Sequence, residues 1–325
     1  MNTTSSRPPV ALAVLGPTGS GKSALAMQLA ARQPVELISI DSAQVYRGMD
    51  IGTAKPSAAE QAAIRHHLID LREPEETYSA GECRRDALAA IADVAARGRL
   101  PVLVGGTMLY FRALFRGMAE LPGADPSLRS ALDARAAIEG WPALHAELAT
   151  RDPAAAQRIH PNDAQRIQRA LELLSAGVGS LDEAWQAGAP DVDGADAVDW
   201  RVVVLEPSDR AVLHQRLADR FEAMLALGFV DEVRRLAARG TLTADSPSMR
   251  AVGYRQLLAY CEGTDSLDAA RDKALAATRQ LAKRQLTWLR SEGLFPHGAR
   301  VHRLDPFDSA AAEQFMNVGR HELLA

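Results

Sequence analysis

The chain of 325 residues has little of several residue types that mark specialised classes of protein. It contains only two cysteines, Cys83 and Cys261, which excludes a disulfide framework and a cysteine zinc site. Its histidines lack the spacing of metal ligands. No apolar run approaches the length of a membrane span, and residues 1–9 lack the apolar core of a signal peptide. We therefore expect a cytoplasmic protein that does not contact membranes.

The chain also has no large excess of either charge. Its formal net charge is −4, with 24% charged residues, which argues against a protein that coats nucleic acid indiscriminately. This net charge is compatible with a local basic face. With 47% hydrophobic residues and no internal repeat, the composition is that of a globular protein with one large domain or two ordinary ones.

Short apolar segments alternate with helical ones in the first 120 residues, which is typical of a doubly wound parallel α/β sheet. The helical segments are 24–32 and 81–97. The expected strands are Val10–Leu15, Val35–Ile40, His67–Leu71, Leu100–Val104 and, much later, Trp200–Leu205.

The segment between the fourth and fifth strands has a different character. Residues 122–199 are alanine-rich and helical, and we expect them to form an insertion domain within a core made of 1–121 and 200–325. Two long helices are expected in the second part of the core, at 209–239 with a break near Gly228, and at 266–290.

A glycine-rich loop follows the first strand and precedes a helix. It matches the phosphate-loop (P-loop) template Gly-x4-Gly-Lys-[Ser/Thr] at every fixed position. Its backbone N–H groups and the helix N-terminus attract phosphate, Lys22 adds a full positive charge, and Ser23 can place a hydroxyl on Mg²⁺. The loop therefore predicts a site for a di- or triphosphate. Its residues are Gly16, Pro17, Thr18, Gly19, Ser20, Gly21, Lys22 and Ser23.

Two further residues follow expected strands at the same edge of the sheet. Asp41 could bind Mg²⁺ through water or accept a proton from a nucleophile, but it could equally cap the next turn. Thr107 follows Gly105-Gly106 and could present its hydroxyl to the crevice, although a plain helix N-cap is the simpler interpretation.

Basic residues gather at three places outside the loop. The helix 266–290 carries Arg279, Lys283, Arg284 and Arg290 beside an apolar stripe with no acid in the segment 278–290, which favours contact with a phosphate backbone over a merely solvated face. Arg216 and Arg220 lie one helical turn apart and could clamp a phosphate. A third polar cluster, 162–169, lies in the insertion.

Taken together, these segments resemble the tRNA dimethylallyltransferase family, also called tRNA isopentenyltransferases. The P-loop is shared with many proteins, but the strings at 41–46 and 283–288 are far more specific. Cys83 departs from the aromatic residue expected there. The matching strings are Gly16–Ser23, Asp41–Tyr46, Met49–Pro56, His66–Asp70, Tyr78–Ala80, Gly105–Tyr110, Arg250–Arg255 and Leu281–Trp288.

The resemblance implies that the loop binds the diphosphate of dimethylallyl diphosphate. The acceptor would be N6 of the adenine 3′ of the tRNA anticodon (position 37), with Asp41 as the base and Thr107 positioning the adenine or a diphosphate oxygen. Arg220, Lys22 and Mg²⁺ on Ser23 would stabilise the diphosphate leaving group. The chain is expected to act as a monomer.

The resemblance also implies a set of residues that grip the anticodon stem-loop. They are Asp41, Ser42, Ala43, Gln44, Thr107, Arg129, Gln165, Arg166, Ile167, Gln168, Arg169, Arg250, Ala251, Val252, Gly253, Tyr254, Arg255, Lys283, Arg284, Gln285, Leu286, Thr287, Trp288, Leu289 and Arg290.

Two other functions share part of this pattern. A small-molecule P-loop kinase using ATP would explain the loop, the sheet and the arginine pair, but not the acid-free basic helix segment. A P-loop regulatory or RNA-binding protein without transferase activity would not need the retained Lys22, Ser23 and Asp41.

Overall fold

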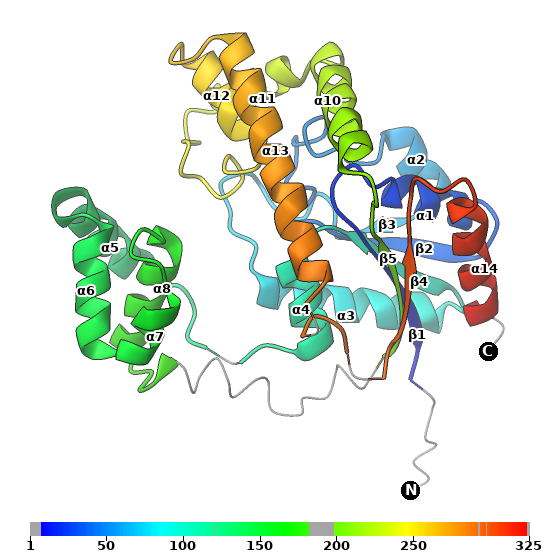
Figure 1. The fold of residues 1–325 in the computed structure, drawn as a ribbon, viewed down its shortest axis with the longest axis horizontal. Helices are drawn as coiled ribbons and strands as arrows, with labels where there is room; N and C mark the ends of the chain where they lie inside the picture. Colours follow the sequence, from blue (N-terminus) through cyan, green and yellow to red (C-terminus); the bar gives the residue numbers. More distant parts are fainter. Residues whose placement is uncertain (1–7, 120, 182–197, 292, 297, 324–325) are drawn as a thin grey trace, which may run out of the picture. The chain divides into compact units, whose positions relative to one another are not determined.

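The computed structural model describes residues 8–119, 121–181, 198–291, 293–296 and 298–323. The chain divides into two compact units, one formed by residues 1–116 and 193–325 and the other by residues 117–192 (Figure 1). The first unit contains the sheet and the P-loop. In the described parts of the chain, no helix is both long enough and apolar enough to cross a membrane.

The first unit is built on a six-stranded sheet in which every paired strand is parallel, in the order β3-β2-β4-β1-β5-β6. The parallel α/β fold predicted from the sequence is confirmed. The strands are β1 Val10–Leu15, β2 Val35–Ile40, β3 His66–His67, β4 Leu100–Gly105, β5 Asp199–Leu205 and β6 Arg300–Leu304.

Two strands differ from the sequence prediction. The expected strand 67–71 is wrong in extent, because Leu68 and Asp70 adopt left-handed backbone angles (φ 62° and 54°) that take the chain out of the sheet. The edge strand β6 was not predicted. Its five residues carry three basic side chains, so it lacks the apolar run that marks the buried strands.

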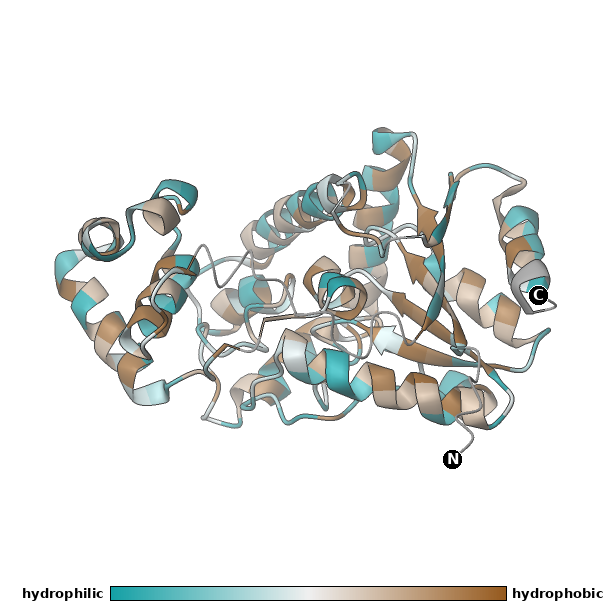
Figure 2. Ribbon diagram, turned by 90° about the horizontal axis from the view of Figure 1, so that it is seen from below, coloured by the Kyte–Doolittle hydropathy of each residue, from teal (hydrophilic) through white to brown (hydrophobic). Residues whose placement is uncertain are grey.

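Helices cover both faces of the sheet. Leu12 and Val14 of β1 face α1 and α14, whereas Ala11, Ala13 and Leu15 face the other layer. Figure 2 shows the strands as largely hydrophobic, as expected for a sheet buried on both sides. The helices of this unit are α1 Lys22–Ala30, α2 Ala58–Ala63, α3 Ala80–Ala96, α4 Met108–Arg116, α10 Arg210–Ala226, α11 Phe229–Ala237, α12 Tyr254–Cys261, α13 Leu267–Leu289 and α14 Ala311–Leu323.

The strand register brings three chain segments together at the carboxyl edge of the sheet. Gly105 at the end of β4 pairs with both Leu15 of β1 and Ile40 of β2. A Cβ atom at Gly105 would lie 2.0 Å from the Ile40 carbonyl oxygen, so only glycine fits there. The P-loop, the segment after β2 and the segment after β4 therefore leave the sheet side by side, where ligands bind in doubly wound folds.

The second unit is a cluster of four described helices with its own core (Figure 1, green). Leu144 and Leu148 of α6 and Ile167 and Leu171 of α8 are buried in that core. Residues 182–197, which the sequence prediction placed in the helical insertion, lie outside the described residues. The helices are α5 Pro126–Glu139, α6 Trp141–Arg151, α7 Pro153–Arg158 and α8 Ala164–Ser175.

Candidate active site

The P-loop connects β1 to α1 through a tight backbone turn. Gly19 and Gly21 both have φ of +81°, a backbone angle that residues with a side chain rarely adopt. The Ser20 N–H donates to the Pro17 carbonyl over 3.2 Å. Gly21 precedes the first residue of α1, Lys22. A Cβ atom at Gly19 would lie 2.8 Å from the side chain of Leu217 on α10. Helix α10 therefore packs directly against the loop and carries Arg220 to it.

Two cations of this loop region have no acidic partner. The Lys22 ammonium donates to the Pro17 carbonyl (3.2 Å), and the Arg220 guanidinium donates to the Thr18 hydroxyl (3.4 Å). Neither takes part in a salt bridge within the described residues. Burial and the neighbouring Arg220 lower the pKa of Lys22 to about 8, although Asp41 opposes the shift. Burial also lowers the pKa of Arg220.

The structure distinguishes the two arginines of α10. Arg216 is exposed, and its guanidinium stacks over the Phe307 ring with 4.5 Å to the centroid. Arg220 instead points to Thr18 in the P-loop. The two neighbouring cations of the loop region form no salt bridge within the described residues, and the Asp41 carboxylate offsets only part of their charge, so the site favours an anion with several negative charges. Arg220, rather than Arg216, therefore lies at the P-loop.

Asp41 lies at the end of β2 and is partly exposed. One carboxylate oxygen, Oδ1, accepts the backbone N–H groups of Ala43 (2.8 Å) and Gln44 (3.4 Å). The carboxylate therefore caps the turn, as the simpler interpretation of the sequence suggested. The same two contacts orient the side chain, and its other oxygen, Oδ2, accepts no hydrogen bond from the described residues. Capping and proton acceptance are thus compatible.

Thr107 links the ends of β4 and β2. Its hydroxyl accepts the Ser42 N–H over 3.0 Å and donates to the Ser42 hydroxyl over 3.4 Å, rather than capping the helix that it precedes. The Asp41–Ser42 peptide is therefore attached to the segment after β4. This places Thr107 beside Asp41, the candidate base. Thr107 is only partly exposed.

A buried carboxylate that the sequence analysis did not single out supports the Asp41 turn. Glu232 on α11 accepts the N–H groups of Asp50, Ile51 and Gly52 at 2.8–3.1 Å and the Tyr254 hydroxyl at 2.6 Å. The Gln44 side-chain nitrogen donates to the Thr53 and Ala54 carbonyl oxygens, which directly follow the segment 50–52. The sequence string 49–56 was the only signal for this network. It did not reveal Glu232, because nothing in the sequence shows that Glu232 contacts this string.

The outer face of α13 is basic and open. Arg279, Lys283, Arg284 and Thr287 are exposed, whereas Leu286, Leu289 and Gln285 are buried and Trp288 is partly buried. The buried side chains hold the helix to the core. Gln285, Leu286 and Leu289, which the resemblance implied as RNA contacts, are therefore not presented to solvent.

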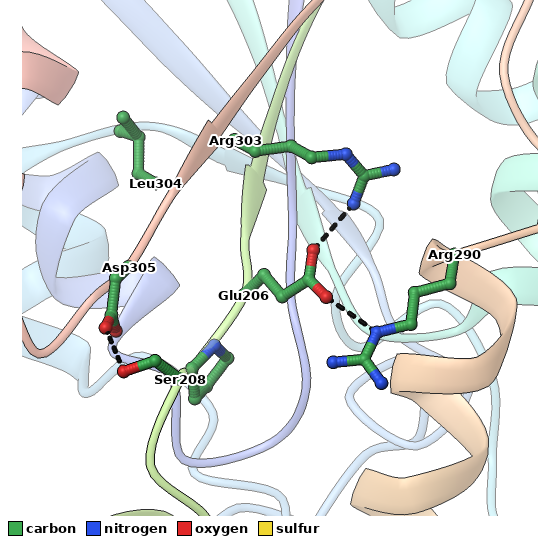
Figure 3. Close-up of a pocket in the computed structure, with 7 residues that line it drawn as sticks. Glu206, Ser208, Arg290, Arg303, Leu304 and Asp305 are labelled. Carbon is green, nitrogen blue, oxygen red and sulfur yellow. Dashed lines mark hydrogen bonds and ion pairs between the residues drawn. The ribbon is translucent and has the colours of Figure 1, made fainter.

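Arg290 at the end of α13 is tied to the sheet instead of being free. Figure 3 shows Glu206, just after β5, between the guanidinium groups of Arg290 (2.6 Å) and Arg303 (2.8 Å). Burial alone would raise the pKa of Glu206, but the hydrogen bonds from these arginines outweigh it and lower the pKa. The cavity here, of about 310 Å³, holds a neutralised cluster, and Arg290 is a weaker candidate for phosphate than Lys283.

The string 250–255 mixes exposed and buried residues. Arg250 and Arg255 are exposed, and Ala251 and Val252 are partly buried. Tyr254 is fully buried against Glu232, and a Cβ atom at Gly253 would lie 2.9 Å from the Phe229 ring. Only the two arginines of this string present charged side chains to solvent.

In the helical unit, several of the predicted RNA contacts form an internal network around Glu172. Arg129 donates twice to this buried carboxylate (3.2 Å each), and Arg169 donates to it over 2.6 Å. Gln168 donates to Asp133 over 2.7 Å. Ile167 is buried. Gln165 and Arg166 are exposed and remain the outward-facing members of the cluster.

The fold and the site together define an α/β protein of the P-loop type whose loop faces an acidic turn and a basic helix. Comparison with known proteins identifies the family. A model described as IPP transferase matches residues 44–292. The chain therefore belongs to the IPP transferase family.

Two bacterial relatives carry the name tRNA dimethylallyltransferase. The one from Burkholderia cenocepacia is 56% identical over 286 residues, 88% of each chain. The one from Burkholderia thailandensis is 57% identical over 278 residues, 86% of each chain. The family resemblance and the prenyl-transferring enzyme class predicted from the sequence are confirmed, and the kinase alternative finds no support.

Solved structures support the same family assignment. A tRNA isopentenylpyrophosphate transferase from Bacillus halodurans has a TM-score of 0.66 at 35% identity, with 97% of each chain covered. A eukaryotic dimethylallyltransferase acting on tRNA has a TM-score of 0.75 at 26% identity, covering 94% of this chain and 77% of that one.

The lowered pKa of Lys22 predicts how donor binding depends on pH. Below about pH 8 the free enzyme already holds the Lys22 proton, whereas above it a proton must be taken up when a diphosphate binds. We therefore expect the Kd for dimethylallyl diphosphate to rise above pH 8, by up to about tenfold per pH unit for one proton. Isothermal titration calorimetry between pH 7 and 9.5 measures this change.

Lys22→Arg is the matched variant, because a guanidinium keeps its proton throughout this pH range. Its Kd is expected to be flat over the same interval. A wild-type Kd that is also flat would show that Lys22 does not carry the titration.

Proposed function

We propose that this chain transfers a dimethylallyl group from dimethylallyl diphosphate to N6 of the adenine at position 37 of tRNA and releases diphosphate. The observation that supports this most strongly is the convergence at one sheet edge of the unpaired cations Lys22 and Arg220 with the Asp41–Thr107 pair. All these residues come from one compact unit of one chain, which suits a monomer. We infer that it acts on tRNA in the cytoplasm.

The P-loop would bind the donor's diphosphate. Its backbone N–H groups and the N-terminus of α1 provide partial positive charge, to which Lys22 and Arg220 add two full charges. As the bond from C1 of the dimethylallyl group to oxygen breaks, the electron pair moves to the diphosphate. The same groups then stabilise the growing negative charge on the leaving group.

The residues present also suit a magnesium ion. Ser23 lies in the first turn of α1 with an exposed side chain, and its hydroxyl is the kind of oxygen ligand that Mg²⁺ accepts beside water and phosphate oxygens. A bound Mg²⁺ would neutralise diphosphate charge. The site has no cluster of three or more acidic, histidine or cysteine ligands among the described residues, so the substrate would have to supply most of the coordination.

On the acceptor side, Asp41 would take the proton that N6 loses as the new carbon–nitrogen bond forms. Its Oδ1 is held by the turn, which leaves Oδ2 to face the amine. Thr107, attached to Ser42, would position the adenine. Reaching N6 requires the base to be unstacked, which costs at most a few kcal/mol and less in a single-stranded loop.

The tRNA backbone would lie against the exposed cations of α13, with Arg250 and Arg255 as further contacts. In the helical unit, taken by itself, Gln165 and Arg166 are the proposed tRNA contacts. These side chains are exposed, and Lys283 and Arg284 have no acidic partner in the described ion pairs.

A direct assay tests the function. The protein is incubated with unmodified tRNA that has adenine at position 37 and with labelled dimethylallyl diphosphate, and the nucleosides are analysed after digestion. We expect label on adenosine, and none on a transcript in which position 37 is guanosine. Transfer from labelled ATP to a small molecule, with no prenyl transfer, would contradict the proposal.

The exposed face of α13 predicts a change in salt sensitivity. Each lost phosphate contact flattens the slope of log affinity against log salt by about 0.7 to 0.9. Lys283→Ala combined with Arg284→Ala should therefore weaken tRNA binding and flatten the slope by roughly 1.4 to 1.8, with donor affinity preserved. Filter binding at several salt concentrations measures the slope.

The control is Arg271→Ala combined with Lys273→Ala on the same helix, because these two cations are already paired with Glu222 and Asp265. It should leave the slope unchanged. The buried residues Ala282, Leu286 and Leu289 are intact in both variants. Equal slopes for the wild type and the first variant would show that this face is merely solvated.

A further inference from the structure

Gln285 lies on the buried side of α13 and bridges two catalytic segments. Its side-chain oxygen accepts the Thr18 N–H of the P-loop over 2.9 Å, and its side-chain nitrogen donates to the Gly106 carbonyl over 2.8 Å. Gln285 is only 7% exposed. Both partners are backbone groups of fixed polarity, so the amide has one orientation that satisfies both.

The segment after β4 is shaped to receive this amide. A Cβ atom at Gly106 would lie 2.5 Å from the Gln285 side-chain nitrogen, and its next neighbour is the Gly16 carbonyl at 3.4 Å. Glycine at 106 therefore leaves room for the Gln285 amide. Gly106 directly precedes Thr107, and Thr18 lies in the P-loop, so one side chain touches both the donor side and the acceptor side of the site.

We propose that Gln285 is a positioning residue that holds the P-loop and the Gly106–Thr107 segment at the separation needed for prenyl transfer. This rests on the proposed function, and it assigns Gln285 an internal role instead of the RNA contact that its sequence string implied. Because Lys283 and Arg284 lie on the exposed side of the same helical turn, the bridge also joins the proposed tRNA-binding face to the donor loop.

The two ends of the bridge permit a double-mutant test. Gln285→Ala removes both hydrogen bonds, and Gly106→Ala pushes the flexible end of the Gln285 side chain away. A misplacement of about 1 Å near the reacting atoms can cost roughly a hundredfold in rate. We expect each single variant to lower the single-turnover rate at saturating substrates by about tenfold to a hundredfold.

In the Gln285→Ala background, the added methyl group at position 106 enters space that the amide has left. The double variant should therefore be within about threefold of Gln285→Ala, far from the product of the two single effects. The Kd for tRNA should stay within twofold of wild type in all three variants. Gln314→Ala, an exposed glutamine on α14, is the matched control and should be unaffected.

Binding of inorganic diphosphate with Mg²⁺ provides a readout that does not need transfer. Loosening the P-loop should raise this Kd severalfold in both single variants, again without additivity in the double. If the wild-type protein fails to transfer a prenyl group, the proposed function is wrong. The diphosphate Kd values would still show whether Gln285 positions the P-loop. The positioning role of Gln285 would be contradicted if the effects of the two single variants were additive in the double variant. It would also be contradicted if the variants lost tRNA affinity while the rate at saturating substrates stayed unchanged.

Discussion

Asp41→Asn is expected to lower the single-turnover rate of prenyl transfer by roughly a hundredfold to ten-thousandfold, the range for loss of a general base. Asparagine keeps an oxygen that can accept the Ala43 and Gln44 N–H groups, so the turn after β2 should survive. It cannot take the amine proton. Rapid-quench measurement with saturating tRNA and dimethylallyl diphosphate gives this rate.

Donor affinity separates this role from a structural one. The Asp41 carboxylate opposes the depression of the Lys22 pKa, so its negative charge reaches the donor site. Removing that charge should leave the Kd for dimethylallyl diphosphate unchanged or slightly lower. Asp308→Asn is the matched control, because Asp308 caps a turn through the Ala310 N–H in the same way. An Asp41→Asn enzyme with the wild-type rate would remove Asp41 from the mechanism.

Lys22→Ala is expected to impair both donor binding and the chemical step. A unit charge about 4 Å from a phosphate oxygen contributes on the order of 4 kcal/mol at an effective dielectric near 20, or roughly a thousandfold. We expect the Kd for dimethylallyl diphosphate to rise by about a hundredfold to a thousandfold. The rate at saturation should fall as well, because charge on the leaving group grows as the carbon–oxygen bond breaks.

The contrast between these two variants is diagnostic. Asp41→Asn should lower the rate without weakening donor binding, whereas Lys22→Ala should lower the rate and raise the donor Kd together. Lys273→Ala, which removes an exposed lysine paired with Asp265, controls for a general loss of positive charge. If Lys22→Ala bound dimethylallyl diphosphate as tightly as wild type, the loop would be holding something else.

Much of the scaffold could be predicted from the sequence alone because its signals are local. The apolar runs gave β1, β2, β4 and β5, and the P-loop template located the turn before α1. The edge strand β6 escaped because pairing with β5, not its own composition, makes it a strand. The end of β3 was also not predicted from the sequence. This strand ends where Leu68 and Asp70 adopt left-handed backbone angles that take the chain out of the sheet.

For the candidate site, the sequence by itself determined which residue types are available and in which strings they occur. Only the tertiary structure decided how they are used. It places Arg220 rather than Arg216 at the loop, commits Arg290 to Glu206, and turns Gln285 inward to Thr18 and Gly106. These contacts join residues far apart in the chain, and their partners are fixed by strand register and helix packing, which no local pattern encodes.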